Sequence, residues 1–219
     1  MNRIMKKGGV KMCLNNSMCG CSGNGHNGNG QCTALGPFVA IDAACIPPTV
    51  NTGSIIAFSS GLTTVALATV GEGVISVPSL IGFGTAVPGV TIVGNTLDLS
   101  GIVTEAFVVP RAGNITAISA SFSAFLGAAI VGTTTLRAQI YRAPAGSNVY
   151  TATGAVVDLA PPLTGPLSAG EITFGSANVA PVPVVTGDKL VMVFSIAATT
   201  GVTVAQIITG TASAGITIS

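Results

Sequence analysis

Five cysteines are the residues of this sequence best suited to covalent or metal chemistry. Cys13, Cys19, Cys21 and Cys32 lie in the first 36 residues, and the fifth is Cys45. Structural zinc sites usually carry a Cys-x2–4-Cys pair, whereas Cys19 and Cys21 are only two residues apart. A zinc site, disulfides and free thiols all stay open, and we favour disulfides. An odd number leaves one cysteine over if every pair is internal, so all five are candidates for bonds between subunits.

The only histidine, His26, lies in a tract of alternating glycine and asparagine over residues 23–30. Histidine is the commonest general base in enzymes, and such a base needs rigid support. A Gly-Asn tract offers little support, because both residues accept almost any backbone conformation. We therefore expect a solvated side chain and not a catalytic one.

Carboxylates are few and widely spaced in the C-terminal part of the chain. No motif links any two of them, and we expect them to cap turns or to pair with basic side chains. The acids are Asp98, Glu105, Asp158, Glu171 and Asp188, and the bases are Arg111, Arg137, Arg142 and Lys189. The sequence contains no P-loop, no Gly-x-Ser-x-Gly and no His-Glu-x-x-His. These observations predict that the protein is not an enzyme, and we expect no cofactor and no metal.

Arg137 and Arg142 flank Tyr141 on one expected strand. Such a strip suits a sugar, but two arginines are too few for a nucleic-acid interface. We favour a role at the rim of a subunit interface.

The composition points to a surface that is short of charge. Hydrophobic residues make up 48% of the chain and charged residues 7%, against about 25% in ordinary soluble domains. The surface must therefore consist of Thr, Ser and Asn or be covered by other copies. The net charge of +1 gives no pull towards nucleic acid or membrane lipid. No apolar run approaches the ~20 residues of a membrane-spanning helix.

The start of the chain is basic, with Arg3, Lys6, Lys7 and Lys11, but no apolar run of 7–15 residues follows it. We therefore expect no secretory signal peptide. Met5 and Met12 are also plausible starts.

The chain divides into three parts by composition. Residues 1–36 form a flexible arm rich in Cys, Gly and Asn, and residues 37–53 form an apolar connector. Phe38, Val39, Ile41 and Ile46 of the connector need a surface to cover them, and we take them as the residues that dock the arm, on the same domain or on a neighbouring subunit. Residues 54–219 form a β domain.

Short runs of β-branched residues, interrupted by Gly, Pro, Ser and Asn every 8–12 residues, predict an all-β domain without helices. The expected strands are 54–59, 62–69, 90–93, 96–99, 105–109, 115–125, 134–142, 149–159, 171–179, 189–197 and 203–218. In 115–125, Ile118, Ala120 and Phe122 share one face, with serines opposite. The run 189–195 is apolar throughout, so we expect its strand to face the core on one side and a partner subunit on the other.

Four separated motifs of the β domain resemble the C-terminal domain of BclB-type exosporium glycoproteins, which coat spores of Bacillus and related bacteria. The motifs are Leu80-Ile81-Gly82-Phe83-Gly84, the segment Phe107 to Thr116, Ala160 to Gly165, and the closing Ala212 to Ile218. The resemblance implies a trimeric jelly-roll head similar to those of tumour necrosis factor and complement proteins. The fold class that we predict is therefore an all-β, trimer-forming jelly-roll sandwich with a flexible N-terminal arm.

The N-terminal part departs from that family, because it lacks a Gly-x-y stalk. The arm must then present the head, and docking of each arm into the next trimer would give a head-to-tail fibre. This arrangement resembles that of endospore appendage subunits. We expect a structural protein of the spore surface, made in the mother-cell cytoplasm, with its own copies or another coat protein as partner. A carbohydrate- or receptor-binding head that uses Tyr141 and Tyr150 is the second hypothesis, and an enzyme on the same fold is the third.

Overall fold

The computed structural model describes residues 6–7, 10–11, 53–70, 75–102, 105–125, 130, 132–201 and 205–219. The chain splits into two compact units, Met1–Thr49 and Val50–Ser219. In the first unit the described residues form a short antiparallel pair, β1 (Lys6–Lys7) and β2 (Val10–Lys11). The five cysteines, His26 and the connector residues Phe38, Val39, Ile41 and Ile46 lie outside the described residues.

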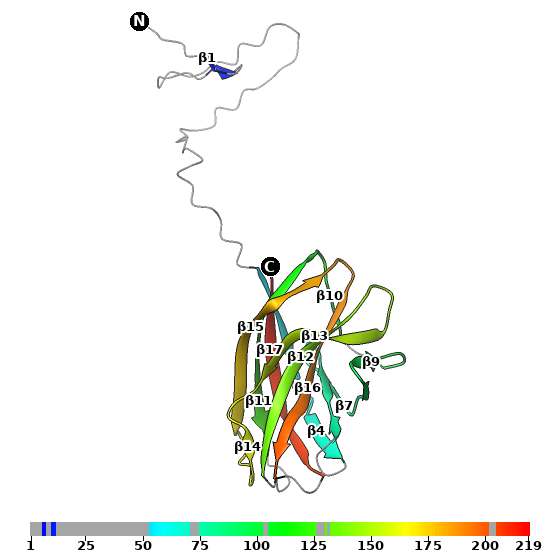
Figure 1. Ribbon diagram of the computed structural model, residues 1–219, viewed down its shortest axis with the longest axis vertical. Helices are drawn as coiled ribbons and strands as arrows, with labels where there is room; N and C mark the ends of the chain where they lie inside the picture. The colour runs from blue at the N-terminus through cyan, green and yellow to red at the C-terminus, as the bar shows by residue number, and fades with distance from the viewer. Residues whose placement is uncertain are drawn as a thin grey trace, which may run out of the picture. The chain divides into compact units, whose positions relative to one another are not determined.

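The second unit consists of two antiparallel sheets that pack face to face as a jelly-roll-like sandwich (Figure 1). We call them the first and the second sheet. The first has the order β15-β11-β17-β4-β5, and β3 also pairs with β17. Its strands are β3 (Ser54–Ser59), β4 (Val65–Val70), β5 (Ile75–Val77), β11 (Gly113–Ala124), β15 (Ile172–Val184) and β17 (Ile207–Ile218).

The second sheet has the order β7-β6-β16-β12-β13-β9-β8, with β10 on β16 and β14 on β12. Its strands are β6 (Ser79–Ile81), β7 (Ala86–Pro88), β8 (Ile92–Val93), β9 (Thr96–Asp98), β10 (Phe107–Val108), β12 (Thr133–Ala143), β13 (Val149–Asp158), β14 (Leu163–Thr164) and β16 (Lys189–Thr200). The described residues contain no helix, and therefore no helix that could cross a membrane. The all-β jelly-roll class is confirmed.

The main core lies between the two sheets, because alternate residues of each long strand point inwards. In β11 the inward side chains include Ile118 and Phe122, and in β12 they include Leu136 and Ile140. Phe194 of β16 is also fully buried. The serines between the inward residues of β11 are exposed or half-buried. The alternation read from residues 115–125 is therefore confirmed.

A second apolar cluster covers the outer side of the second sheet. Val191 and Val193 of β16 are each 1% exposed, and they pack with Leu97 of β9 and the two tyrosines. Strand β16 is thus buried on both faces, as predicted. The expectation that a partner subunit covers its outer face is wrong, because the segment around β8 and β9 of the same chain does so.

All eleven predicted strands overlap observed ones, but their ends differ. β15 continues to Val184, through Pro181 and Pro183, because it is an edge strand of its sheet and needs fewer backbone donors. Four short strands of the β domain were not predicted, β5, β6, β7 and β14, and neither were β1 and β2 in the arm. Two or three residues carry no periodicity, so only pairing with a long neighbour reveals them.

Two motifs that are distant in sequence meet at one end of the second sheet. The Val109 N–H donates to the Asp188 carbonyl oxygen (2.8 Å), and the Gly187 N–H donates to the Val109 carbonyl oxygen (2.9 Å). The Asp188 carboxylate closes the turn by accepting the Val185 N–H at 2.9 Å. This double link fixes the start of β16 beside β10.

Candidate assembly surface

The first sheet contains no charged residue in any of its six strands. The charged residues that lie in strands of the β domain are all in the second sheet: Asp98, Arg137, Arg142, Asp158 and Lys189. One side of the first sheet therefore faces the core, and its other side presents only uncharged side chains from these strands.

Strands β15, β11, β17 and β3 have one side that points away from the core, which we call the outer face. It consists mainly of small side chains. The register places Ser119 of β11 between Ser176 of β15 and Gly215 of β17. The outward residues of β17 are Ile207, Thr209, Thr211, Ser213, Gly215 and Thr217, and those of β3 are Ile55, Ala57 and Ser59. Small uncharged side chains let another surface approach closely without the cost of burying a charge.

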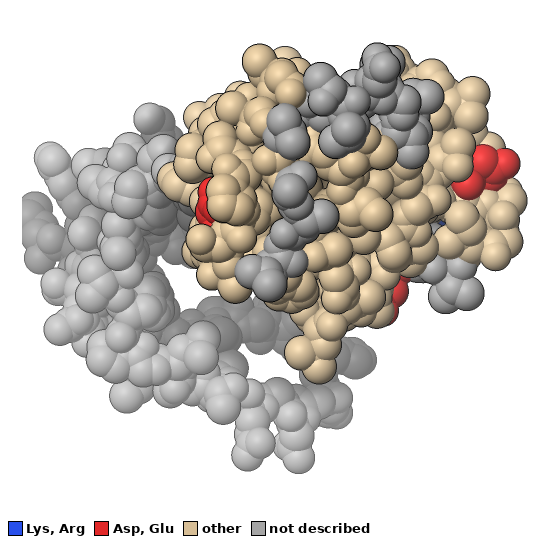
Figure 2. Space-filling view, turned by 90° about the horizontal axis from the view of Figure 1, so that it is seen from below, with Lys and Arg blue, Asp and Glu red and all other residues tan. Residues whose placement is uncertain are grey.

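Most large apolar side chains of the outer face stand at the end far from the C-terminus, whereas Ile55, 81% exposed, stands at the other end opposite Thr217. Ile172 pairs with Ser123, and Phe174 pairs with Ser121. Phe174 is 65% exposed and Ile172 55%. Phe125 and Ile207 are exposed on the same side, since their neighbours Ala124 and Ile208 point into the core. Viewed from below, the described surface is almost free of charged side chains (Figure 2).

In the part of the β domain that the structure describes, each of the five carboxylates binds a backbone N–H or an arginine. Asp98 accepts the Ser100 N–H at 2.9 Å, and hydrogen bonding to Ser100, first through its side chain and then through its backbone, lowers the pKa of the Asp98 carboxyl. Glu105 accepts the Phe83 N–H at 2.7 Å, and Glu171 accepts the Ser168 N–H at 3.4 Å. Asp158 pairs with Arg137 at 2.6 Å and Asp188 with Arg142 at 3.7 Å. No two of these five acids share a hydrogen bond.

The predicted strip of Arg137, Tyr141 and Arg142 is not continuous. Arg137 points outwards to Asp158, whereas Arg142 donates from Nη1 to the Pro183 carbonyl oxygen of the opposite sheet at 2.6 Å. Tyr141 is 5% exposed and Tyr150 1%, and burial raises the pKa of both phenols. Neither ring is therefore an exposed platform for a sugar.

No group of three or more potential metal-ligating side chains occurs in the described part of the chain. The cysteine and docking-residue predictions concern the arm and the connector, and they stay predictions. Sequence reasoning missed the exposed apolar residues of β15, although Ile172-Thr173-Phe174 alternates. The alternation of apolar and polar residues predicts the wrong inward face here, because the polar Thr173 points inwards and its apolar neighbours point outwards.

No protein-family model matches the chain. Over 182 aligned residues, 78% of this chain, it is 33% identical to Collagen-like protein 1 of Acanthamoeba polyphaga mimivirus. The chain spans only 19% of the length of that viral protein. Among solved structures, Eiger TNF from S. frugiperda aligns over 75% of this chain and 94% of its own, at 8% identity and a TM-score of 0.31. A TM-score this low does not support a fold assignment. The jelly-roll-like class rests on the strand order and the packing described above.

Proposed function

We propose that this chain is a structural protein whose β domain forms a homotrimer through the outer face, and whose arm links the trimers into a layer or fibre on a spore surface. The observation that carries the proposal is the charge-free first sheet with its exposed apolar end. A monomer gains nothing from leaving Phe125, Ile172, Phe174 and Ile207 in water, whereas an interface core is depleted of charge and enriched in such residues.

The viral relative supports a structural role. Its printed name is collagen-like, and a collagen triple helix winds three chains around one axis. A domain that belongs to such a protein is brought together in threes, so its exposed face meets two identical faces. These 219 residues contain no Gly-x-y tract, and we assign the contacts that hold the trimer to the β domain.

The arm is the part of the chain that we assign to linking trimers. Its cysteines at positions 13, 19, 21 and 32 suit covalent bonds between subunits once the surroundings become oxidising. The connector patch of Phe38, Val39, Ile41 and Ile46 suits docking on a neighbouring trimer. The spore surface as the location rests on the resemblance to exosporium glycoproteins.

The alternative, a carbohydrate- or receptor-binding head, is not favoured. It needs an exposed aromatic platform, and both tyrosines of the chain are buried.

The test combines sedimentation with electron microscopy on the full chain. We expect trimers under reducing conditions and, after oxidation, filaments or sheets of linked trimers. A variant with Cys13, Cys19, Cys21 and Cys32 changed to Ser should stop at the trimer. Monomers at all concentrations would contradict the trimer. Discrete trimers in oxidised wild type would contradict only the linking role of the arm.

A further inference from the structure

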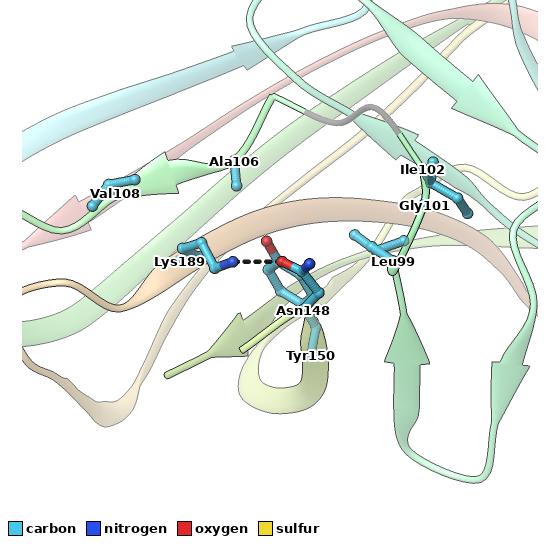
Figure 3. Close-up of a pocket in the computed structure, with 8 residues that line it drawn as sticks. All are labelled: Leu99, Gly101, Ile102, Ala106, Val108, Asn148, Tyr150 and Lys189. Carbon is cyan, nitrogen blue, oxygen red and sulfur yellow. Dashed lines mark hydrogen bonds between the residues drawn. The ribbon is translucent and has the colours of Figure 1, made fainter. Parts of the chain in front are cut away.

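A hollow of about 430 Å³ opens on the second sheet, away from the outer face. Three segments that are distant in sequence line it: the stretch that leads from β9 into β10, the start of β13 and the start of β16. Its lining residues are Leu99, Gly101, Ile102, Ala106, Val108, Asn148, Tyr150 and Lys189 (Figure 3). The volume lies in the range of small-molecule sites, about 300–1,000 Å³.

The polar groups of this hollow are hydrogen-bond donors. Lys189 Nζ donates to Asn148 Oδ1 at 2.7 Å. Because an ammonium group has no acceptor, the amide oxygen of Asn148 must face Lys189, and the amide nitrogen is turned away with its two hydrogens. Figure 3 shows Lys189 and Asn148 joined in the middle of the hollow, with Tyr150 beside them. The ammonium also lies 5.8 Å from the centroid of the Tyr150 ring, which helps to hold it in place.

Lys189 has no carboxylate partner among the described residues, where the ion pairs are Arg137–Asp158 and Arg142–Asp188. Its neighbour Asp188 points to the other side of the strand, where it binds the Val185 N–H and Arg142. Tyr150 adds no negative charge, since burial raises the pKa of its phenol. The hollow therefore holds a positive charge that no group in it neutralises.

Apolar side chains stand beside these donors. Val108 is 56% exposed and Ile102 39%, while Leu99 is buried beneath them. In Figure 3, Val108 lies to the left of Lys189, Leu99 and Ile102 lie to the right of Asn148, and Ala106 lies above the pair. A ligand that lies on the Asn148 side would cover Ile102 and remove its apolar surface from water.

We propose that this hollow binds a small organic monocarboxylate, with its carboxylate on Lys189 and Asn148 and a short apolar group against Ile102 on the Asn148 side of the hollow. A free carboxylic acid and the C-terminal residue of a peptide share this chemistry. The site lies on the sheet opposite the proposed trimer interface, so its test does not depend on assembly.

The test is a titration of the full chain by saturation-transfer difference NMR, with sodium hexanoate as the probe and hexanamide as its uncharged match. We expect saturable binding of hexanoate and at least about tenfold weaker binding of hexanamide, because a charge-assisted hydrogen bond is lost. Acetyl-Gly-Gly-Leu with a free or an amidated C-terminus shows whether a peptide carboxylate also binds.

Two variants locate the site. Lys189→Met should weaken hexanoate binding about tenfold or more, whereas Arg111→Met, which removes the same charge from a side chain that contacts Ser54, should leave it unchanged. Asn148→Asp keeps Lys189 but gives it a carboxylate partner, and it should also lose binding. This variant decides the question if Lys189→Met does not fold. Equal binding of hexanoate and hexanamide, no saturable signal, or equal losses in Lys189→Met and Arg111→Met would overturn the proposal.

Discussion

Replacing Phe174 by serine tests the proposed trimer interface most directly. The ring stands on β15 and leaves 65% of its surface exposed, which corresponds to about 130 Å² if a phenylalanine contributes roughly 200 Å² in all. Burial of that area contributes about 3 kcal/mol per subunit at ~25 cal/mol per Å². Serine matches the small residues of the outer face, so the change removes the area without introducing a charge.

The effect on assembly is large because each trimer contains three copies of the ring. A loss of about 3 kcal/mol per subunit amounts to roughly 10 kcal/mol per trimer, which raises the concentration at the midpoint of assembly by about 10³- to 10⁴-fold. Sedimentation equilibrium of the wild type and of Phe174→Ser under reducing conditions measures this midpoint.

The matched control is Val93→Ser, which removes an apolar side chain that is 72% exposed on β8 of the second sheet. Neither change should alter the stability of the folded subunit by more than about 0.5 kcal/mol, because both positions lie on the surface. An unchanged midpoint in Phe174→Ser, or a larger shift in Val93→Ser, would refute the assignment of the outer face as the interface.

Three further changes test how the domain is held together, each by urea unfolding of the reduced protein. Phe122→Ala empties a fully buried position of the main core and should lower the free energy of unfolding by about 3–5 kcal/mol; a loss below ~1 kcal/mol would contradict the packing. Asp188→Ala leaves the Val185 N–H and Arg142 without their partner, so we expect a loss of about 1–3 kcal/mol; no loss would show that the turn closes without it. Gly61→Ala should lower the free energy of unfolding by at least ~1 kcal/mol, because Gly61 has a φ of +56° and an added Cβ would meet the Gly84 backbone. Unchanged stability would show that the turn relaxes easily.

The sequence alone determined the strands and their inward faces wherever the alternation was long enough. Ile118, Ala120 and Phe122 point into the core as predicted, and each of the five acids caps a turn or forms an ion pair. The low charge was also evident from composition. The physical reason is local, because a side chain's direction along a strand follows from its position in a two-residue period.

Only the tertiary structure decided which surfaces remain open. Val191 and Val193 are covered by the chain's own residues around β8 and β9, and Arg142 donates to the Pro183 carbonyl oxygen of the opposite sheet. The hollow at Lys189 unites residues up to 90 positions apart in the chain, from Leu99 to Lys189. The pairing of distant strands depends on the packing of the whole domain, and no local period in the sequence records it.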